Sequence, residues 1–61
     1  MLYTFIVKDI YGNWFTCRSF FTSKQMAEDA ALDVAEYQFI DLVRVMNSDE
    51  NIIKQTKSNL N

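Results

Sequence analysis

The sequence contains no histidine and no proline, and it has only one glycine and one cysteine among its 61 residues. Without histidine, the chain lacks the side chain that most often acts as a general base near neutral pH. One glycine is too few for the glycine-rich loops that bind phosphate groups. We therefore expect a protein that works by contact with another molecule, without catalysis and without a cofactor.

The single cysteine, Cys17, cannot form a disulfide within the chain. Because disulfides are typical of oxidising compartments, this composition predicts a cytoplasmic protein. A catalytic cysteine would also need a base beside it, and the chain has no histidine to serve. We expect Cys17 to be a small buried side chain opposite Phe5, since free cysteines are usually buried.

The absence of proline, repeats and low-complexity segments predicts one domain over residues 1–47, followed by a polar tail over residues 48–61. The apolar opening at residues 1–7 is too short to span a membrane, so no membrane association is expected. Six Lys and Arg against eight Asp and Glu give a net charge of −2. That balance alone does not indicate a nucleic acid, a membrane surface or an acidic partner.

Two stretches, residues 2–9 and 14–21, are rich in aromatic and β-branched residues and predict two strands. The turn-like residues 10–13 between them predict a hairpin. The hairpin register decides which side chains face the core, because a shift of one residue moves every side chain to the other face.

Two registers are possible for this hairpin. A two-residue loop pairs Tyr11 with Trp14, whereas a type I turn with Gly12 in the left-handed conformation pairs Asp9 with Asn13. We favour the second register, because the first places charged side chains among the apolar residues of both faces. The helix-facing residues of the hairpin are then Tyr3, Phe5, Val7, Phe15, Cys17 and Phe21. The opposite face carries Leu2, Thr4, Ile6, Lys8, Trp14, Thr16, Arg18 and Phe20.

A helix is predicted over residues 23–38, with Thr22 as its N-cap. Gln25 completes a capping box with Thr22, and Phe21 can contact Met26 as a hydrophobic staple. At helical spacing one apolar stripe faces the sheet, made of Met26, Ala27, Ala30, Ala31, Val34 and Tyr37. The alanines allow a close approach, so the large side chains expected to fill the core are Phe5, Phe15, Phe21 and Tyr37.

Residues 40–46 predict a third strand, with Val43 and Val45 facing the helix. Its outward residues are Leu42, Arg44 and Met46. The predicted fold is α+β with ββαβ topology, in which one helix covers one face of a three-stranded antiparallel sheet whose first strand is central. The polar tail over residues 48–61 forms either a short helix capped by Ser48 or a frayed end.

Three carboxylates, Asp29, Asp33 and Glu36, lie at i, i+4 and i+7 along one ridge of the predicted helix. This spacing could offer oxygen ligands to a hard cation, but a solvated acidic face is the commoner arrangement, so no metal site is predicted. Over residues 23–38, one lysine against four acidic residues leaves a net charge of −3. The acidic ridge is therefore a candidate surface for binding a partner.

Three basic residues, Lys8, Arg18 and Arg44, are predicted to project from the outer sheet face beside Trp14. With a helix on only one side of the sheet, this apolar and aromatic face is left uncovered, and such a patch usually has a partner. Another protein could bind it, since Trp and Arg dominate interface energetics. Alternatively, two copies bury it against each other, or the tail folds over it through Ile52, Ile53 and Leu60.

The second and third strands, predicted as sheet edges without proline, offer a further route to a partner by strand addition. An aromatic and basic sheet can also hold single-stranded nucleic acid. That partner is disfavoured, because only three basic residues lie beside an acidic helix and such binding would fall steeply with salt.

The helix closes in residues 31–39, ALDVAEYQF, and runs directly into the strand at residues 40–46, IDLVRVM. Together with the preceding strand that ends in an aromatic residue, this segment resembles a known family over residues 14–46. The family is the short inhibitor of host RNA polymerase that T-odd podophages make early in infection. In that family the last strand carries two arginines, two residues apart, that contact the polymerase; Arg44 matches the first, and Met46 stands at the second.

The resemblance implies a protein that binds the jaw of the polymerase β′ subunit and blocks promoter opening. We therefore predict a small phage-type inhibitor that acts sterically in the host cytoplasm, with bacterial RNA polymerase as the first target. A CRISPR effector or another defence complex is the second, since similar acidic helices after a hairpin occur in anti-CRISPR proteins. A homodimeric accessory domain is the third hypothesis.

Overall fold

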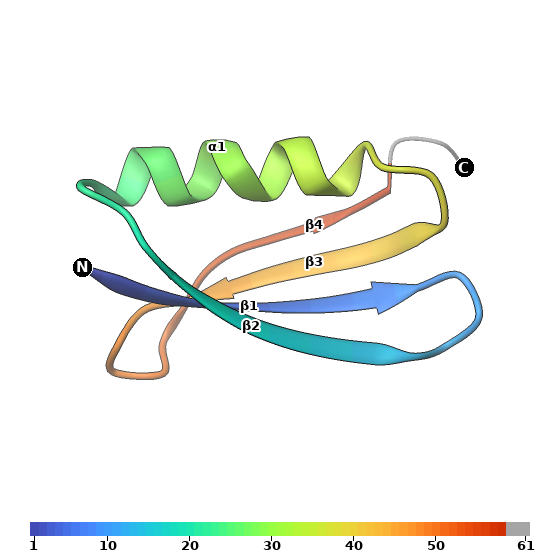
Figure 1. The fold of residues 1–61 in the computed structure, drawn as a ribbon, viewed down its shortest axis with the longest axis horizontal. Helices are drawn as coiled ribbons and strands as arrows, with labels where there is room; N and C mark the ends of the chain where they lie inside the picture. Colours follow the sequence, from blue (N-terminus) through green and yellow to red (C-terminus); the bar gives the residue numbers. More distant parts are fainter. Residues whose placement is uncertain (59–61) are drawn as a thin grey trace.

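The computed structural model of the chain describes residues 1–58 and shows one helix over one face of an antiparallel sheet (Figure 1). The elements are β1 (Leu2–Asp9), β2 (Trp14–Phe20), α1 (Lys24–Ala35), β3 (Ile40–Met46) and β4 (Ile52–Lys57). The sheet order is β2-β1-β3-β4, so the predicted α+β class and the interior position of β1 are confirmed. The prediction of three strands was wrong, because a fourth strand pairs with β3.

The register favoured for the first hairpin is confirmed. The N–H of Asp9 donates to the carbonyl of Asn13 at 3.0 Å, and Lys8 lies opposite Trp14. Gly12 has a φ of +88°, the left-handed conformation that glycine adopts without a steric penalty. The odd-numbered residues of β1 therefore face the helix.

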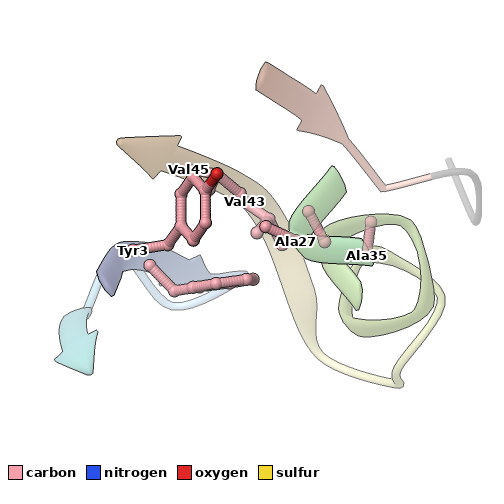
Figure 2. Close-up of a cluster of buried hydrophobic side chains, with 7 residues drawn as sticks. Tyr3, Ala27, Ala35, Val43 and Val45 are labelled. Carbon is pink, nitrogen blue, oxygen red and sulfur yellow. The ribbon is translucent and has the colours of Figure 1, made fainter. Parts of the chain in front are cut away.

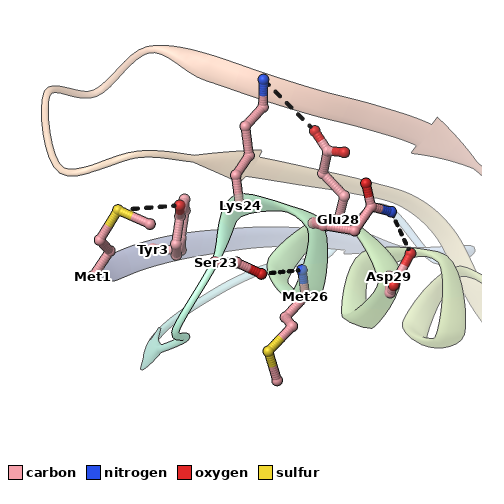
Figure 3. Close-up of polar contacts among 8 residues, drawn as sticks. Met1, Tyr3, Ser23, Lys24, Met26, Glu28 and Asp29 are labelled. Carbon is pink, nitrogen blue, oxygen red and sulfur yellow. Dashed lines mark hydrogen bonds and ion pairs between the residues drawn. The ribbon is translucent and has the colours of Figure 1, made fainter.

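The helix begins one residue later than predicted. Ser23, not Thr22, is the N-cap, and its hydroxyl accepts a hydrogen bond from the backbone N–H of Met26 at 3.2 Å (Figure 3). The predicted capping box is absent, because the side-chain amide of Gln25 donates to Asp29 at 3.0 Å instead. Either hydroxyl could cap a helix, so the sequence did not distinguish these two neighbours.

The helix also ends earlier than residue 38. Its last residue is Ala35, and Tyr37 N–H bonds the carbonyl of Val34 at 3.0 Å in a tighter turn. Phe39 then has a φ of 73°, which cannot continue a right-handed helix. The chain reverses there and enters β3.

Small side chains bring the helix close to the sheet. Ala27, Ala31 and Ala35 are fully buried at i, i+4 and i+8, and they lie against the fully buried Val43 and Val45 of β3 (Figure 2). The predicted orientation of β3 is thereby confirmed. Tyr3 and Phe5 of β1 complete the core, and Phe21 closes one side with its ring centroid 6.1 Å from that of Tyr3 and 5.7 Å from that of Phe5.

Several residues predicted in the core are exposed instead. The helix lies over β3 and β4, because the fourth strand shifts the centre of the sheet away from the first hairpin (Figure 1). Phe15 is consequently 57% exposed, and Cys17 beside it is exposed rather than buried. Met26 is exposed on the helix, and Tyr37 is exposed in the turn that follows the end of the helix at Ala35.

The segment predicted as a polar tail forms β4, and neither a capped helix nor a frayed end is present over residues 48–58. Ile53 packs against the core on the helix side, so the tail does not fold over the outer face through this residue. Ile52 is exposed, and Leu60 lies outside the described residues. Because β4 pairs with β3, the prediction that the third strand is a sheet edge was also wrong.

The turn before β4 repeats the geometry of the turn before β2. Asn47 accepts hydrogen bonds on its side-chain oxygen from the N–H groups of Asp49 and Asn51, each at 3.0 Å. The carboxylate of Asp9 accepts two bonds in the same way in the first turn. Glu50 has a φ of 65° at the position that Gly12 occupies in the first turn. This second turn aligns β4 with β3.

Candidate binding face of the sheet

We define the outer face as the side of the sheet that is turned away from α1. The pairings place four residues in a row across it, Trp14, Lys8, Leu42 and Lys57. The next row contains Thr16, Ile6, Arg44 and Gln55. The remaining rows contain Arg18, Thr4, Met46 and Ile52, and then Phe20 and Leu2. No helix covers this face in residues 1–58.

The outer face is basic, although the chain as a whole has a net charge of −2. Each strand contributes one cation to it, namely Lys8, Arg18, Arg44 and Lys57. None of the residues in these rows is acidic, and Lys8 Nζ forms an ion pair with Asp41 at 3.7 Å. The sheet thus separates a positive surface from the acidic helix.

Trp14 lies at one corner of this face, on the edge strand β2, and its ring reaches inward across the sheet. Its ring centroid lies 5.7 Å from Nζ of Lys8 and 5.8 Å from Cζ of Arg44, so the indole lies across β1 and reaches the cation of β3. Contacts of this kind contribute about 0.5 to 1 kcal/mol each at exposed sites. Arg44 is further held by Gln55, whose side-chain oxygen accepts a hydrogen bond from Nε at 2.8 Å.

The Trp14 cluster, made of Lys8, Trp14, Arg44 and Gln55, is therefore partly ordered before any partner arrives. Trp14 nevertheless remains 52% exposed. Ordered aromatic and arginine side chains lose less conformational entropy on binding than mobile ones, so the cluster is suited to serve as an anchor.

Arg18 shares the outer face but not the cluster. It lies opposite Thr4, two rows from Trp14. Phe20, at the end of β2, is 78% exposed and extends the apolar surface beyond Arg18. Three of the four predicted residues of this face, Lys8, Trp14 and Arg44, are thus in contact, and Arg18 lies beside them on the edge strand.

The acidic ridge lies on the other layer of the molecule. Asp29 and Asp33 are exposed on α1 and Glu36 is exposed at its C-cap, and Asp29 accepts a hydrogen bond from Gln25 (Figure 3). No group of three His, Cys, Asp or Glu side chains in residues 1–58 is placed to hold a metal ion. Because the sheet separates the two surfaces, a partner on the outer face does not reach the ridge through the same contact.

Asp9 stabilises the first turn by its charge. Desolvation acts to raise the pKa of its carboxyl, but hydrogen bonds from the backbone and side chain of Asn13 and from the backbone of Tyr11 and Gly12 outweigh that effect. The pKa of Asp9 is therefore lower than its ordinary value. This turn sets the register that brings Lys8 and Trp14 side by side.

Lys57 and Gln55 were not among the residues predicted for the outer face, because their segment was predicted to be a tail. The signal was present in the turn, since Asn47 and Asn51 flank three residues just as Asp9 and Asn13 do. That spacing predicts a second hairpin once the first turn is understood.

Comparison of the chain with protein-family models, with curated proteins and with solved structures finds no match in any of the three. Among residues 1–58, no helix has the length and apolar character needed to cross a membrane.

Proposed function

We propose that the protein is a small phage-type inhibitor that binds a host enzyme complex through its outer face and blocks it without catalysis. Bacterial RNA polymerase is the proposed target. The observation that supports this most is the Trp14 cluster, in which a half-exposed indole contacts both Lys8 and Arg44 on an uncovered sheet.

The chemistry of the face favours an acidic protein surface as its partner. Tryptophan and arginine are the residues whose loss most often weakens protein interfaces, particularly near the centre of the contact. The cations that surround Trp14 would accelerate encounter with an acidic patch and fix the orientation of the complex. The resemblance adds a specific expectation, since Arg44 stands where that family places a polymerase-contacting arginine.

Nucleic acid is a weaker candidate for the same face. The four cations would attract phosphate groups, but the acidic helix and the net charge of −2 oppose the approach of a polyanion. A flat array of four cations supports only weak binding that depends strongly on salt. A protein partner makes use of the apolar residues as well as the charges.

Binding to purified bacterial RNA polymerase tests the proposal directly. The wild-type protein, Arg44→Glu and Lys54→Glu should be compared in a binding titration and in an assay of promoter opening. Both variants change the charge by the same amount, but Lys54 lies opposite Val45 and thus on the helix side of the sheet. We expect Arg44→Glu to weaken binding by about 2 kcal/mol or more, roughly 30-fold, and Lys54→Glu to change it little.

The same assay separates the alternatives. Absence of binding by the wild-type protein at micromolar polymerase would reject RNA polymerase as the target. Equal binding by both variants would reject the outer face as the contact. Binding of a single-stranded oligonucleotide at 50 mM salt that persists at 200 mM salt would favour nucleic acid instead.

A further inference from the structure

The edge strand β2 is exposed on both faces along its whole length. It forms one end of the sheet, and β1 is its one partner among residues 1–58. An edge of this kind presents a row of unpaired backbone N–H and C=O groups that can pair with another strand.

The hydrogen bonds at both ends of the hairpin identify which groups are unpaired. Asp9 N–H donates to Asn13 O at 3.0 Å, and Phe21 N–H donates to Met1 O at 2.9 Å. In an antiparallel pair the bonded positions alternate, so the odd-numbered residues of β2 are bonded to β1. The even-numbered residues, Trp14, Thr16, Arg18 and Phe20, therefore direct their N–H and C=O groups to the free edge.

The two edges of the sheet differ in how they are protected. The pairing that holds β4 contains a register shift at Val45/Met46, and β4 itself carries Lys54 and Lys57. Irregular pairing and lysines are the features that natural sheets use to prevent edge-to-edge association. In contrast, β2 pairs with β1 without a shift from Phe20 to Trp14, and it contains no lysine and no proline.

We propose that β2 pairs antiparallel with β2 of a second copy of this chain, about a two-fold axis that passes midway between Cys17 and Cys17 of the second copy. A two-fold axis perpendicular to the sheet keeps the outer faces of both copies on one side. Opposed residues in an antiparallel pair project to the same face, so the even-numbered residues of β2, which lie on the outer face, must pair with even-numbered residues of the second copy. Centring the pair on Cys17 is the arrangement that pairs all seven residues of the strand, whereas centring it on Thr16 or Arg18 pairs only five. The result is a continuous eight-stranded sheet.

The side chains that meet in this register are complementary. Trp14 occupies the position opposite Phe20 of the second copy, so this pair places no charge against either aromatic residue. Arg18 lies opposite Thr16 of the second copy, so no like charges face each other, whereas centring on Arg18 would oppose two arginines. On the helix side, the uncovered Cys17 lies opposite Cys17 of the second copy, and Phe15 lies opposite Ser19 of the second copy.

The backbone contribution is substantial. The four opposed even-numbered pairs exchange two hydrogen bonds each, which gives about eight intermolecular bonds. Cys17 faces Cys17 of the second copy in a non-hydrogen-bonded pair, at a Cα separation of about 4.5 Å. That separation lies within the range over which a disulfide can form, so the thiol reports directly on the register.

Oxidative cross-linking of the full chain tests the register. Under mild copper-phenanthroline oxidation we expect Cys17 to form a disulfide-linked dimer at least tenfold faster than the double variant Cys17→Ser with Ser19→Cys. In the proposed register position 19 lies opposite position 15 of the second copy. The Ser19→Cys variant should therefore cross-link only when it is mixed with a second double variant, Cys17→Ser with Phe15→Cys, so that the thiol at position 19 of one copy meets the thiol at position 15 of the other. Equal rates for Cys17 and the Ser19→Cys variant would overturn the proposal.

Substitutions at Thr16 test the dimer without any cross-link. Thr16 is exposed, so Thr16→Glu and Thr16→Arg should both leave the monomer folded, as judged by circular dichroism. In the proposed dimer residue 16 lies opposite Arg18 of the other copy, and this contact occurs twice. Thr16→Glu adds an opposite charge to each contact, so we expect the dimer Kd to fall by about 2- to 30-fold; Thr16→Arg adds a like charge, so we expect the Kd to rise by a similar factor. Sedimentation equilibrium of the reduced proteins measures both constants.

The outcomes are separable from those of the polymerase experiment. A wild-type protein that stays monomeric at several hundred micromolar would reject the dimer, and so would Kd values that move in the same direction in both variants. Neither result bears on whether the outer face binds RNA polymerase, because pairing at the β2 edge leaves that face uncovered.

Discussion

Replacing Glu50 with glycine should stabilise the protein. Glu50 has a φ of 65° in the turn between β3 and β4, and a side chain in this left-handed region costs roughly 1 to 2 kcal/mol. Glycine removes that cost, although its greater freedom in the unfolded chain takes back about 0.5 to 1 kcal/mol. The net expectation is a gain of about 0 to 1.5 kcal/mol, with a midpoint of about 0.75 kcal/mol that corresponds to a rise in Tm of about 3 to 6 °C for a domain of this size.

Thermal unfolding followed by circular dichroism measures this change, and urea unfolding gives the free energy independently. Asp49→Gly is the matched control, because Asp49 lies in the same turn and does not have a positive φ. It should lower Tm, since it adds flexibility to the unfolded chain without relieving strain. If Glu50→Gly lowers Tm as much as Asp49→Gly does, the turn that aligns β4 is not as described.

Two further substitutions test the packing and the electrostatics of the fold. Ala31→Leu should lower the free energy of unfolding by about 1 to 3 kcal/mol, because Ala31 is fully buried between the helix and the sheet. Urea unfolding measures this change, and an unchanged unfolding midpoint would contradict the close packing of the helix on the sheet. Asp9→Asn should lower Tm at neutral pH. Asparagine can form the same turn, as Asn47 does, but it lacks the negative charge that four hydrogen bonds stabilise in Asp9. The pKa of Asp9 is depressed in the folded state, so its stabilisation is present above the ordinary pKa of 3.8 and is lost as the pH falls further. The difference in Tm between wild type and Asp9→Asn should therefore shrink below about pH 4, and a difference that is constant down to pH 2 would contradict this account.

The first hairpin and the third strand were predictable from the sequence because local signals determine them. Gly12 fixes the turn, and the alternation of charged and apolar residues then leaves one acceptable register. The same logic placed Val43 and Val45 against the helix. Three of the four basic and aromatic residues predicted for the outer face consequently lie in contact.

The fourth strand was not predictable from composition, because its residues are mostly polar and its stability comes from pairing with β3. This one omission explains most of the errors in the core. With β4 present, the helix lies over β3 and β4, and Phe15 and Cys17 lose the cover that a three-stranded sheet would have given them. Tyr37 is exposed for a different reason, because the helix ends at Ala35. The edge position of β2 was predicted and is confirmed, whereas the loss of helix cover over β2 follows from the long-range pairing of β4 with β3.

The most direct measurement of the binding face uses Trp14, the single tryptophan of the chain. Protein labelled with 5-fluorotryptophan gives one ¹⁹F NMR signal, which can be followed as purified bacterial RNA polymerase is added. We expect this signal to shift or broaden at substoichiometric polymerase in the wild-type protein and in Lys54→Glu, but not in Arg44→Glu. Polymerase that binds the wild-type protein and leaves the Trp14 resonance unchanged would contradict the assignment of the outer face as the site of contact.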